Sequence, residues 1–198
     1  MDDIVRQAMA KWPNVPDCYG WLGLDMRGQW FMRDDAAQAA GTFASGQPGA
    51  KGSRLQHEKL IAFIERNYAA DAQGCWFFQN GPQRVFVELE ATPWIWRVAD
   101  DGQVTAHSGA PARVHTALLD EQGWLYLHTD LGLGLVHTQD MARAAQALEQ
   151  GLWPLQEVER CALPLQYGYR TSPQTEHAAL SKQLSLIHIS EPTRLGMI

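Results

Sequence analysis

The stretch that decides the fold is Cys75-Trp-Phe-Phe-Gln-Asn-Gly-Pro-Gln-Arg-Val-Phe-Val-Glu-Leu-Glu90. Asn80-Gly81 is the strongest short-range signal for a tight hairpin turn, because both residues accept the positive φ that such a turn needs. Aromatic and β-branched residues, which favour strands, flank it. In the second run Val85, Val87 and Leu89 fall on one face of a strand. The stretch therefore predicts an antiparallel hairpin.

The turn that leads into this hairpin recurs along the chain. Asp71-x-x-Gly-x-Trp76 appears earlier as Asp25-x-x-Gly-x-Trp30 and later, one residue shorter, as Asp120-x-x-Gly-Trp124. Aspartate at the first position can bond the turn backbone, and glycine at the fourth tolerates its strained exit. Each copy thus predicts a turn followed by a Trp-led strand. Three copies with helices between them do not indicate a propeller.

Helices are predicted at three places. Residues 2–12 carry an apolar stripe at helical spacing. Ser53 and Gln56 have the spacing of a capping box, and the apolar residues after them predict a helix from Ser53 to about residue 71. A third helix is predicted between Thr138 and Gly151.

These elements predict an α+β fold of antiparallel hairpins in repeated turn–Trp-strand units, with two or three helices packed on the sheet. The N-terminal helix occupies residues 1–12, and a first hairpin–helix–hairpin unit spans 13–108. Within it, the Ala/Gly/Gln/Ser-rich stretch 36–52 is predicted to be a flexible loop. A second hairpin–helix unit spans 109–173 and is expected to form one compact domain with the first. A tail, 174–183, follows.

The last fifteen residues look foreign to the fold. Leu184-Ser-Leu-Ile-His-Ile-Ser-Glu-Pro-Thr-Arg194 resembles the conceptual translation of a transposon-type sequencing adapter over eleven consecutive codons. We therefore interpret residues 184–198 as a non-native tail and exclude them from the prediction of the fold. The native C-terminus beyond about Gln183 stays open.

Composition restricts the class of protein. The chain has 198 residues, 45% of them hydrophobic, and a net charge of −6, which argues against disorder and against general nucleic-acid binding. No apolar run approaches the roughly 18–20 residues of a membrane span. The acidic N-terminus is unlike a secretory signal, and three widely spaced cysteines suit a reducing cytosol. We expect a cytoplasmic protein with no nucleic-acid or membrane partner; the sequence does not determine its oligomeric state.

Three motifs carry a resemblance to known families. Trp21-Leu-Gly-Leu-Asp25, Trp30-Phe-Met-Arg-Asp34 and Cys75–Arg84 together resemble a conserved, mainly proteobacterial family of unknown function over roughly residues 12–172. The order of hairpins and helix is more distantly similar to another uncharacterised bacterial family, which has tandem hairpin–helix motifs and a suggested signalling role. Neither resemblance implies catalytic residues.

The candidate binding face combines Arg84 with Trp94 and Trp96. Arg84 follows the hairpin tip, where a guanidinium can hold a carboxylate or phosphate through two hydrogen bonds. The two tryptophans project from one strand face: exposed, they would form a platform for a flat ligand; buried, they belong to the core, which we favour. The sequence thus predicts a non-catalytic binding or regulatory module for a small ligand or protein partner.

Other groups of residues give weaker evidence for a functional site. His128 and His137 flank a Gly-rich turn and are weak metal candidates without a defined third ligand, so no metal or cofactor is predicted. Glu88 and Glu90 share a strand face but lack an identifiable acid with a raised pKa. A small enzyme stays an alternative if two of a set of residues converge in a cavity: His115, His128, His137, Glu88 and Arg84. An oligomeric structural subunit is the third alternative and would expose an apolar patch.

Overall fold

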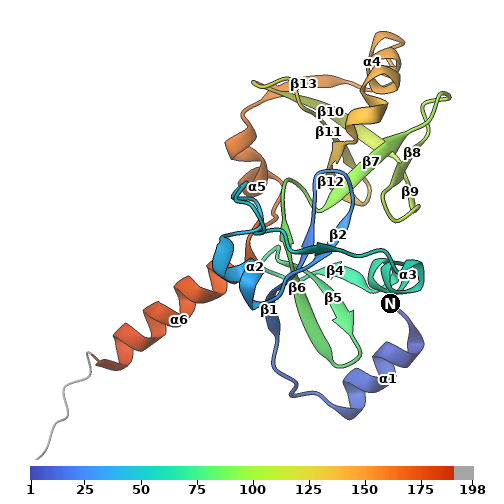
Figure 1. The fold of residues 1–198 in the computed structure, drawn as a ribbon. Helices are drawn as coiled ribbons and strands as arrows, with labels where there is room; N and C mark the ends of the chain where they lie inside the picture. The colour runs from blue at the N-terminus through green and yellow to red at the C-terminus, as the bar shows by residue number, and fades with distance from the viewer. Residues whose placement is uncertain (190–198) are drawn as a thin grey trace, which may run out of the picture.

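The computed structural model describes residues 1–189, with side chains described as far as Gln183. The chain forms two β-sheets with helices around them (Figure 1). Sheet 1 contains β1 (Cys18–Leu24), β2 (Trp30–Met32), β3 (Ser53–Arg54), β4 (Tyr68–Ala70), β5 (Trp76–Asn80) and β6 (Gln83–Leu89). Sheet 2 contains β7 (Trp94–Val98), β8 (Val104–Ala106), β9 (Pro111–Ala112), β10 (Val114–Asp120), β11 (Leu125–Thr129), β12 (Gly132–Val136) and β13 (Leu155–Val158). The predicted α+β class is confirmed, and β5–β6 is the predicted hairpin.

The two sheets repeat one strand order. Sheet 1 runs β3-β2-β1-β6-β5-β4, and sheet 2, read from its β9 edge, runs β9-β8-β7-β12-β11-β10 before β13 is added. In each sheet the first strand pairs antiparallel with the second and parallel with the sixth. The duplication is therefore one of topology.

The repeated turn is the local unit of this duplication. In the copy that begins at Asp25, Asp25 N donates to Gln29 O and Gly28 N donates to Asp25 O, both at 3.0 Å. Asp25 Oδ1 also accepts from the amides of Arg27 and Gln29. The same backbone pair of bonds occurs at 71–75, 99–103, 106–110 and 120–124. The three predicted turns are confirmed; the two further copies begin with alanine, which supplies no carboxylate.

The helices partly follow the predictions. α1 (Asp3–Lys11) and α4 (Met141–Glu149), the latter preceded by the 3-10 turn η1 (Thr138–Asp140), lie where the sequence predicts them. α3 (Glu58–Arg66) is shorter than predicted at both ends. The prediction of a capping box at Ser53 is wrong. Ser53 instead pairs with Met32 of β2, and Tyr68 pairs with Phe78 of β5, so strand pairing removes both ends of the predicted helix.

The stretch 36–52, predicted to be a flexible loop, is helical in its first part. It begins within α2 (Asp35–Ala40), whose first turn is capped by Asp34. Arg33, fully buried, donates hydrogen bonds to four backbone carbonyls. The acceptors are the carbonyls of Gly20, Ala37, Gly41 and Ala50, at 2.6–3.4 Å. One buried guanidinium thus organises a segment that has no apolar periodicity.

The strands change from one sheet to the other between Leu89 and Trp94. The strands 94–98 and 104–106, which the sequence analysis assigned to the first unit, therefore belong to sheet 2. The sheets share a hydrophobic cluster in which Leu24 and Leu89 of sheet 1 meet Ile95 and Leu135 of sheet 2. α3 contributes Ile64 to the same cluster. The domain limits stay a prediction.

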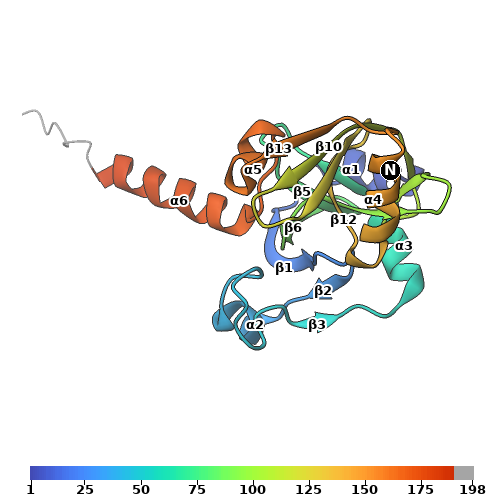
Figure 2. The ribbon, with the colours of Figure 1, turned by 90° about the horizontal axis from the view of Figure 1, so that it is seen from above.

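The chain returns to sheet 1 at its end. After β13 it passes through η2 (Arg160–Ala162) and α5 (Leu163–Gln166) into α6 (Pro173–Ile189), for most of which the sequence predicted only a tail. Figure 2 shows α6 beginning against the body and projecting away from it. Residues 184–189 of the suspected adapter segment continue this helix, and 190–198 lie outside the described residues. No helix within the described residues is long and apolar enough to cross a membrane.

Candidate functional site

Trp94 and Trp96 lie in the core. Trp96 is fully buried and Trp94 is 9% exposed. Their indole Nε1 atoms donate to backbone carbonyls, that of Trp94 to Leu131 O and that of Trp96 to Leu127 O, each at 2.9 Å. Two buried rings with satisfied donors cannot form an exposed platform. The candidate face is corrected accordingly: both tryptophans stabilise sheet 2.

Arg84 does lie on an aromatic surface, but with other rings. Its guanidinium sits 5.4 Å from the ring centroid of Phe86 and 5.7 Å from that of Phe77. Asp17 accepts from its Nε and Nη2, at 2.9 and 2.7 Å. This bidentate pair holds the guanidinium flat and raises the pKa of Arg84. Arg84 therefore supports the ring surface rather than reaching freely into solvent.

The rings continue across the strands as a stack. Tyr19 of β1 lies parallel to Phe86, with centroids 4.6 Å apart. On its other side Tyr19 meets the imidazole of His177 from α6, at 4.2 Å and 18°. Stacked rings at such distances are attractive beyond the area they bury. The stack joins a face of sheet 1 to α6, the last helix of the described chain.

A cavity of about 400 Å³ opens beside this stack, and we call it the α6 pocket. Its walls come from β1, the β4–β5 turn, the segment before α6, and the first turns of α6. Residues that line it and bear polar or aromatic groups include Tyr19, Asp71, Cys75, Arg170, Glu176 and His177. The volume falls within the range of small-molecule sites.

Glu88 fixes the helix that closes this pocket. Its side chain is buried, and its carboxylate accepts from Ser172 Oγ at 2.6 Å and from Gln174 N at 2.9 Å. The second bond satisfies one of the free amides in the first turn of α6. Burial raises the pKa of Glu88, against the opposing effect of these two hydrogen bonds. Glu88 is thus a positioning residue for the pocket wall.

The pocket carries charges of both signs. Arg170 Nη1 and Glu176 Oε1 are 3.9 Å apart, beyond hydrogen-bond distance, and both side chains are about half exposed. Asp71 Oδ1 is engaged by the amides of Gln73 and Cys75. Burial raises the pKa of the Cys75 thiol to about 11, so this cysteine stays protonated and is a poor nucleophile at neutral pH.

The structure separates His128 from His137. His137 Nδ1 accepts from Gln139 N at the start of η1. His128 faces His115 instead, with ring centroids 5.8 Å apart, and packs on Tyr167. Burial and the neighbouring His115 lower the pKa of His128. Within the described part of the chain no three potential ligands come together as a metal site, and the His115–His128 pair lines neither the α6 pocket nor the acidic cavity described next.

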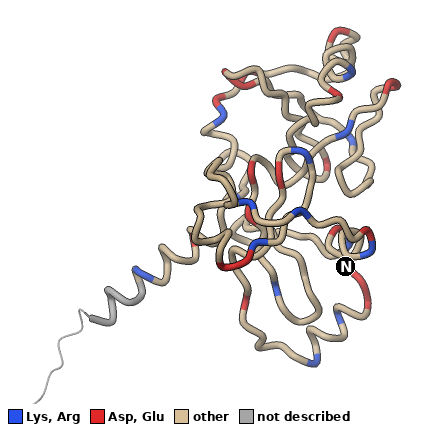
Figure 3. Tube along the Cα trace, in the orientation of Figure 1, with Lys and Arg blue, Asp and Glu red and all other residues tan. Residues whose placement is uncertain are grey.

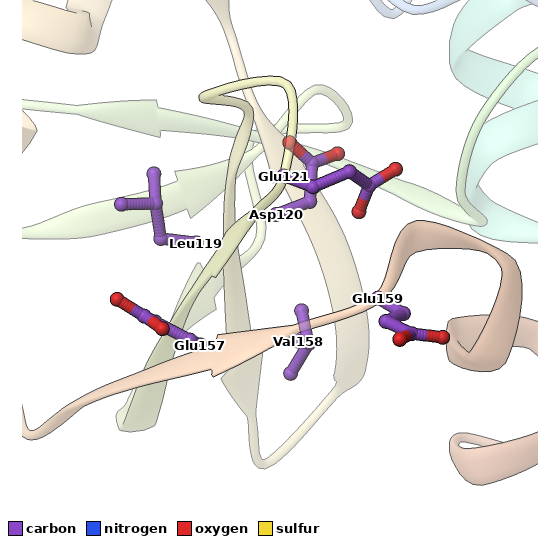
Figure 4. A pocket seen from close by; sticks show the side chains of 6 residues that line it. All are labelled: Leu119, Asp120, Glu121, Glu157, Val158 and Glu159. Carbon is purple, nitrogen blue, oxygen red and sulfur yellow. The ribbon is translucent and has the colours of Figure 1, made fainter.

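A second cavity, of about 420 Å³, lies between β10 and β13 and is acidic (Figure 4). Two of the carboxylates in this cavity already accept hydrogen bonds from neighbouring groups of the protein. Asp120 accepts from two turn amides and from Tyr126 Oη, and Glu121 accepts from Arg160 N. Glu157 and Glu159 lie at opposite ends of the view (Figure 4). The carboxylates do not converge on one point, so we regard the α6 pocket as the candidate site.

The sequence did not predict the α6 pocket. Asp71 and Cys75 lie in motifs quoted from the sequence but were not predicted as site residues, and Arg84 lies behind the stack. Arg170 and His177 were missed because no spacing links them to the hairpin; the backbone bond from Arg170 N to Gly74 O brings them there.

The DUF2944 family model, described as "Protein of unknown function (DUF2946)", matches residues 1–188. The chain belongs to this family. The predicted resemblance to a family of unknown function is confirmed at that level. No curated protein matches the chain. A solved structure of a DUF1285 family protein from Silicibacter pomeroyi DSS-3 is similar to this DUF2944 member with a TM-score of 0.45 and 13% identity, over 74% of this chain and 84% of that one.

Proposed function

We propose that the protein is a non-catalytic module that binds a small polar molecule in the α6 pocket. The observation that carries the proposal is the combination in one cavity of a stacked ring surface, Tyr19 and His177, with the guanidinium of Arg170. Small-molecule sites typically pair an apolar surface with a few polar groups that fix orientation. Asp71 and Glu176 complete that set.

Two features favour binding over catalysis. The thiol in the pocket is held protonated by burial, as its raised pKa indicates. The carboxylate of Glu88, which a hydrolytic mechanism would need to be accessible, is buried and engaged by Ser172 and Gln174. Both groups therefore serve the structure of the pocket.

Arg84 keeps its proposed role in binding, now through the stack. Its guanidinium lies over Phe86, which supports Tyr19. We also propose a cytoplasmic location, which three unpaired cysteines in the described residues favour. Lys and Arg are interspersed with Asp and Glu along the chain trace of both sheets (Figure 3), and the net charge of −6 favours a small ligand or a protein partner over nucleic acid.

The test is native mass spectrometry of the full chain, purified gently from a bacterial cytosol. We expect additional mass from a small molecule, and a rise in melting temperature when the stripped protein is mixed with a small-molecule extract of that cytosol. The double variant Arg170→Ala/His177→Ala should lose both signals. Arg160→Ala, which lies near the acidic cavity, is the matched control and should keep them. Absence of both signals in the native protein, or their survival in the double variant, would contradict the proposal.

A further inference from the structure

We infer that the ligand of the α6 pocket is a small zwitterion with a planar ring, resembling an aromatic amino acid in its charges. Its anionic group would bind Arg170, its cationic group Asp71 and Glu176, and its ring the Tyr19–His177 stack. This inference rests on the proposed function and specifies its ligand.

The anionic group of the ligand would bind the guanidinium of Arg170. Arg170 is placed by its backbone, whose amide donates to Gly74 O at 2.9 Å. Its guanidinium makes no side-chain hydrogen bond within the described residues, since its contact with Glu176 is 3.9 Å long. A planar guanidinium with five donors matches a carboxylate through two parallel bonds.

The cationic group of the ligand has two candidate partners in the cavity. Asp71 belongs to the β4–β5 turn and Glu176 to the first turn of α6, and both line the cavity. The turn amides engage Oδ1 of Asp71, at 2.9 Å each, and leave Oδ2 for a ligand. An ammonium with three donors can therefore reach carboxylate oxygens from two elements.

The planar ring of the ligand would pack on the Tyr19–His177 stack. Tyr19 is held from behind by Phe86, and its exposed side is covered by the imidazole of His177, itself an exposed residue of α6. A flat ligand can extend this stack over the outer face of the exposed imidazole. Such ring-on-ring contact adds to the affinity that burial of the ligand supplies.

Both charges are needed because the pocket would penalise either alone. A ligand with only an anionic group would bind near Arg170 and be repelled by the carboxylates of Asp71 and Glu176, which line the same cavity. A ligand with only a cationic group would be repelled by the guanidinium of Arg170. The arrangement selects by repulsion as well as attraction.

The experiment is isothermal titration of the full chain, near neutral pH and at low salt, with three probes of one ring size. They are L-phenylalanine, 3-phenylpropionate, which lacks the ammonium, and 2-phenylethylamine, which lacks the carboxylate. We expect L-phenylalanine to bind about tenfold more tightly than either of the others. Arg170→Met should reduce its affinity to that of 2-phenylethylamine, and Glu176→Gln should weaken it without weakening 3-phenylpropionate. Arg160→Met is the control.

Equal affinity for a singly charged probe, or no binding of any of the three, would overturn the inference. A bound metabolite without both charges, found by native mass spectrometry and lost in Arg170→Ala/His177→Ala, would do so as well. That last result would leave the proposed function intact, so the two failures are distinguishable.

Discussion

Sheet 1 and sheet 2 share a strand order but differ in what covers the face that points away from their shared hydrophobic cluster. The face of sheet 2 that bears Trp96 packs against Ala144 and Ala147 of α4 and against Trp153. The corresponding cluster on sheet 1 has three buried members, Cys75, Phe77 and Phe86, with Tyr19 and Ala69 at its edge. One sheet is therefore closed by apolar packing, and the other carries a ring surface beside a polar cavity.

The difference arises from the connections. After β12 the chain turns back through η1 and α4, which cover the sheet they have just left. After β6 it passes directly into β7, and sheet 1 receives its cover from α6 at the end of the described chain. A face covered by a distant segment, held by few contacts, can keep a cavity. Two sheets of the same topology thus differ in that one face is filled by a helix and the other lies beside a cavity.

The largest effect is expected where sheet 2 is closed. Trp96→Ala removes a fully buried indole and should lower the free energy of unfolding by about 4 kcal/mol. Urea denaturation measures it. Trp21→Ala on sheet 1, at a side chain 43% exposed, is the control and should cost about 1 kcal/mol or less. An equal loss of unfolding free energy in the two variants would contradict the expected difference in packing between the two sheets.

The junction between the sheets should be sensitive to acid. His107 lies against Trp30 and Tyr68 of sheet 1 and Trp94 of sheet 2, and its Nε2 is buried with no hydrogen-bond partner in the described chain. Burial lowers its pKa from 6.5 to about 4. Because the folded state disfavours the charged imidazole, this stability is complete above about pH 6.5 and is lost as pH falls toward 4, by roughly 3 kcal/mol.

His107→Asn, which keeps an acceptor for Ile95 N, should remove most of this pH dependence in urea denaturation at about pH 7 and about pH 5. His57→Asn, at the exposed N-cap of α3, is the control and should keep it. An unchanged slope in His107→Asn would refute the assignment.

The attachment of α6 should depend on Glu88. Glu88→Ala removes the acceptor for Ser172 Oγ and Gln174 N, so amides of 172–180 should exchange faster, by an opening free energy lower by about 2 kcal/mol. Because burial raises the pKa of Glu88, protonation favours the docked helix, and mild acid should not release it. Hydrogen–deuterium exchange measures both.

Glu90→Ala is the matched control for this prediction. It loses bonds to Met26 N and Lys51 but none to α6, and protection of 172–180 should persist. Equal loss of protection in the two variants would mean that α6 responds to the general stability of sheet 1.

The smallest effect on stability is expected at Arg84. Its pair with Asp17 is partly exposed, so Arg84→Ala should cost less than about 1 kcal/mol in urea denaturation. Ligand capture should weaken all the same, since the support of the Tyr19–Phe86 stack is lost. Arg113→Ala, at an exposed residue between β9 and β10, should change neither. Undiminished capture in Arg84→Ala would remove Arg84 from the site.

Local features were readable from the sequence because their causes are local. An aspartate that bonds its own turn, an Asn-Gly corner and an alternating strand act within a few residues, and they predicted the α+β class, the turns and the β5–β6 hairpin. The predicted helix start at Ser53 was wrong and α2 within residues 36–52 was not predicted, because both depended on partners outside the local pattern: the β2 ladder and the buried guanidinium of Arg33.

The site needed the tertiary structure for the same reason. Among the residues at or behind the α6 pocket, only Arg84 was predicted as part of a binding site, and no pattern in the sequence linked it to Arg170, Glu176 or His177. Nor could it decide whether Trp94 and Trp96 face solvent, because a strand face is exposed or buried according to what packs on it. Propensity and turn chemistry set the strands; the path of the chain after β6 and β12 decided which sheet face was filled and which kept a pocket.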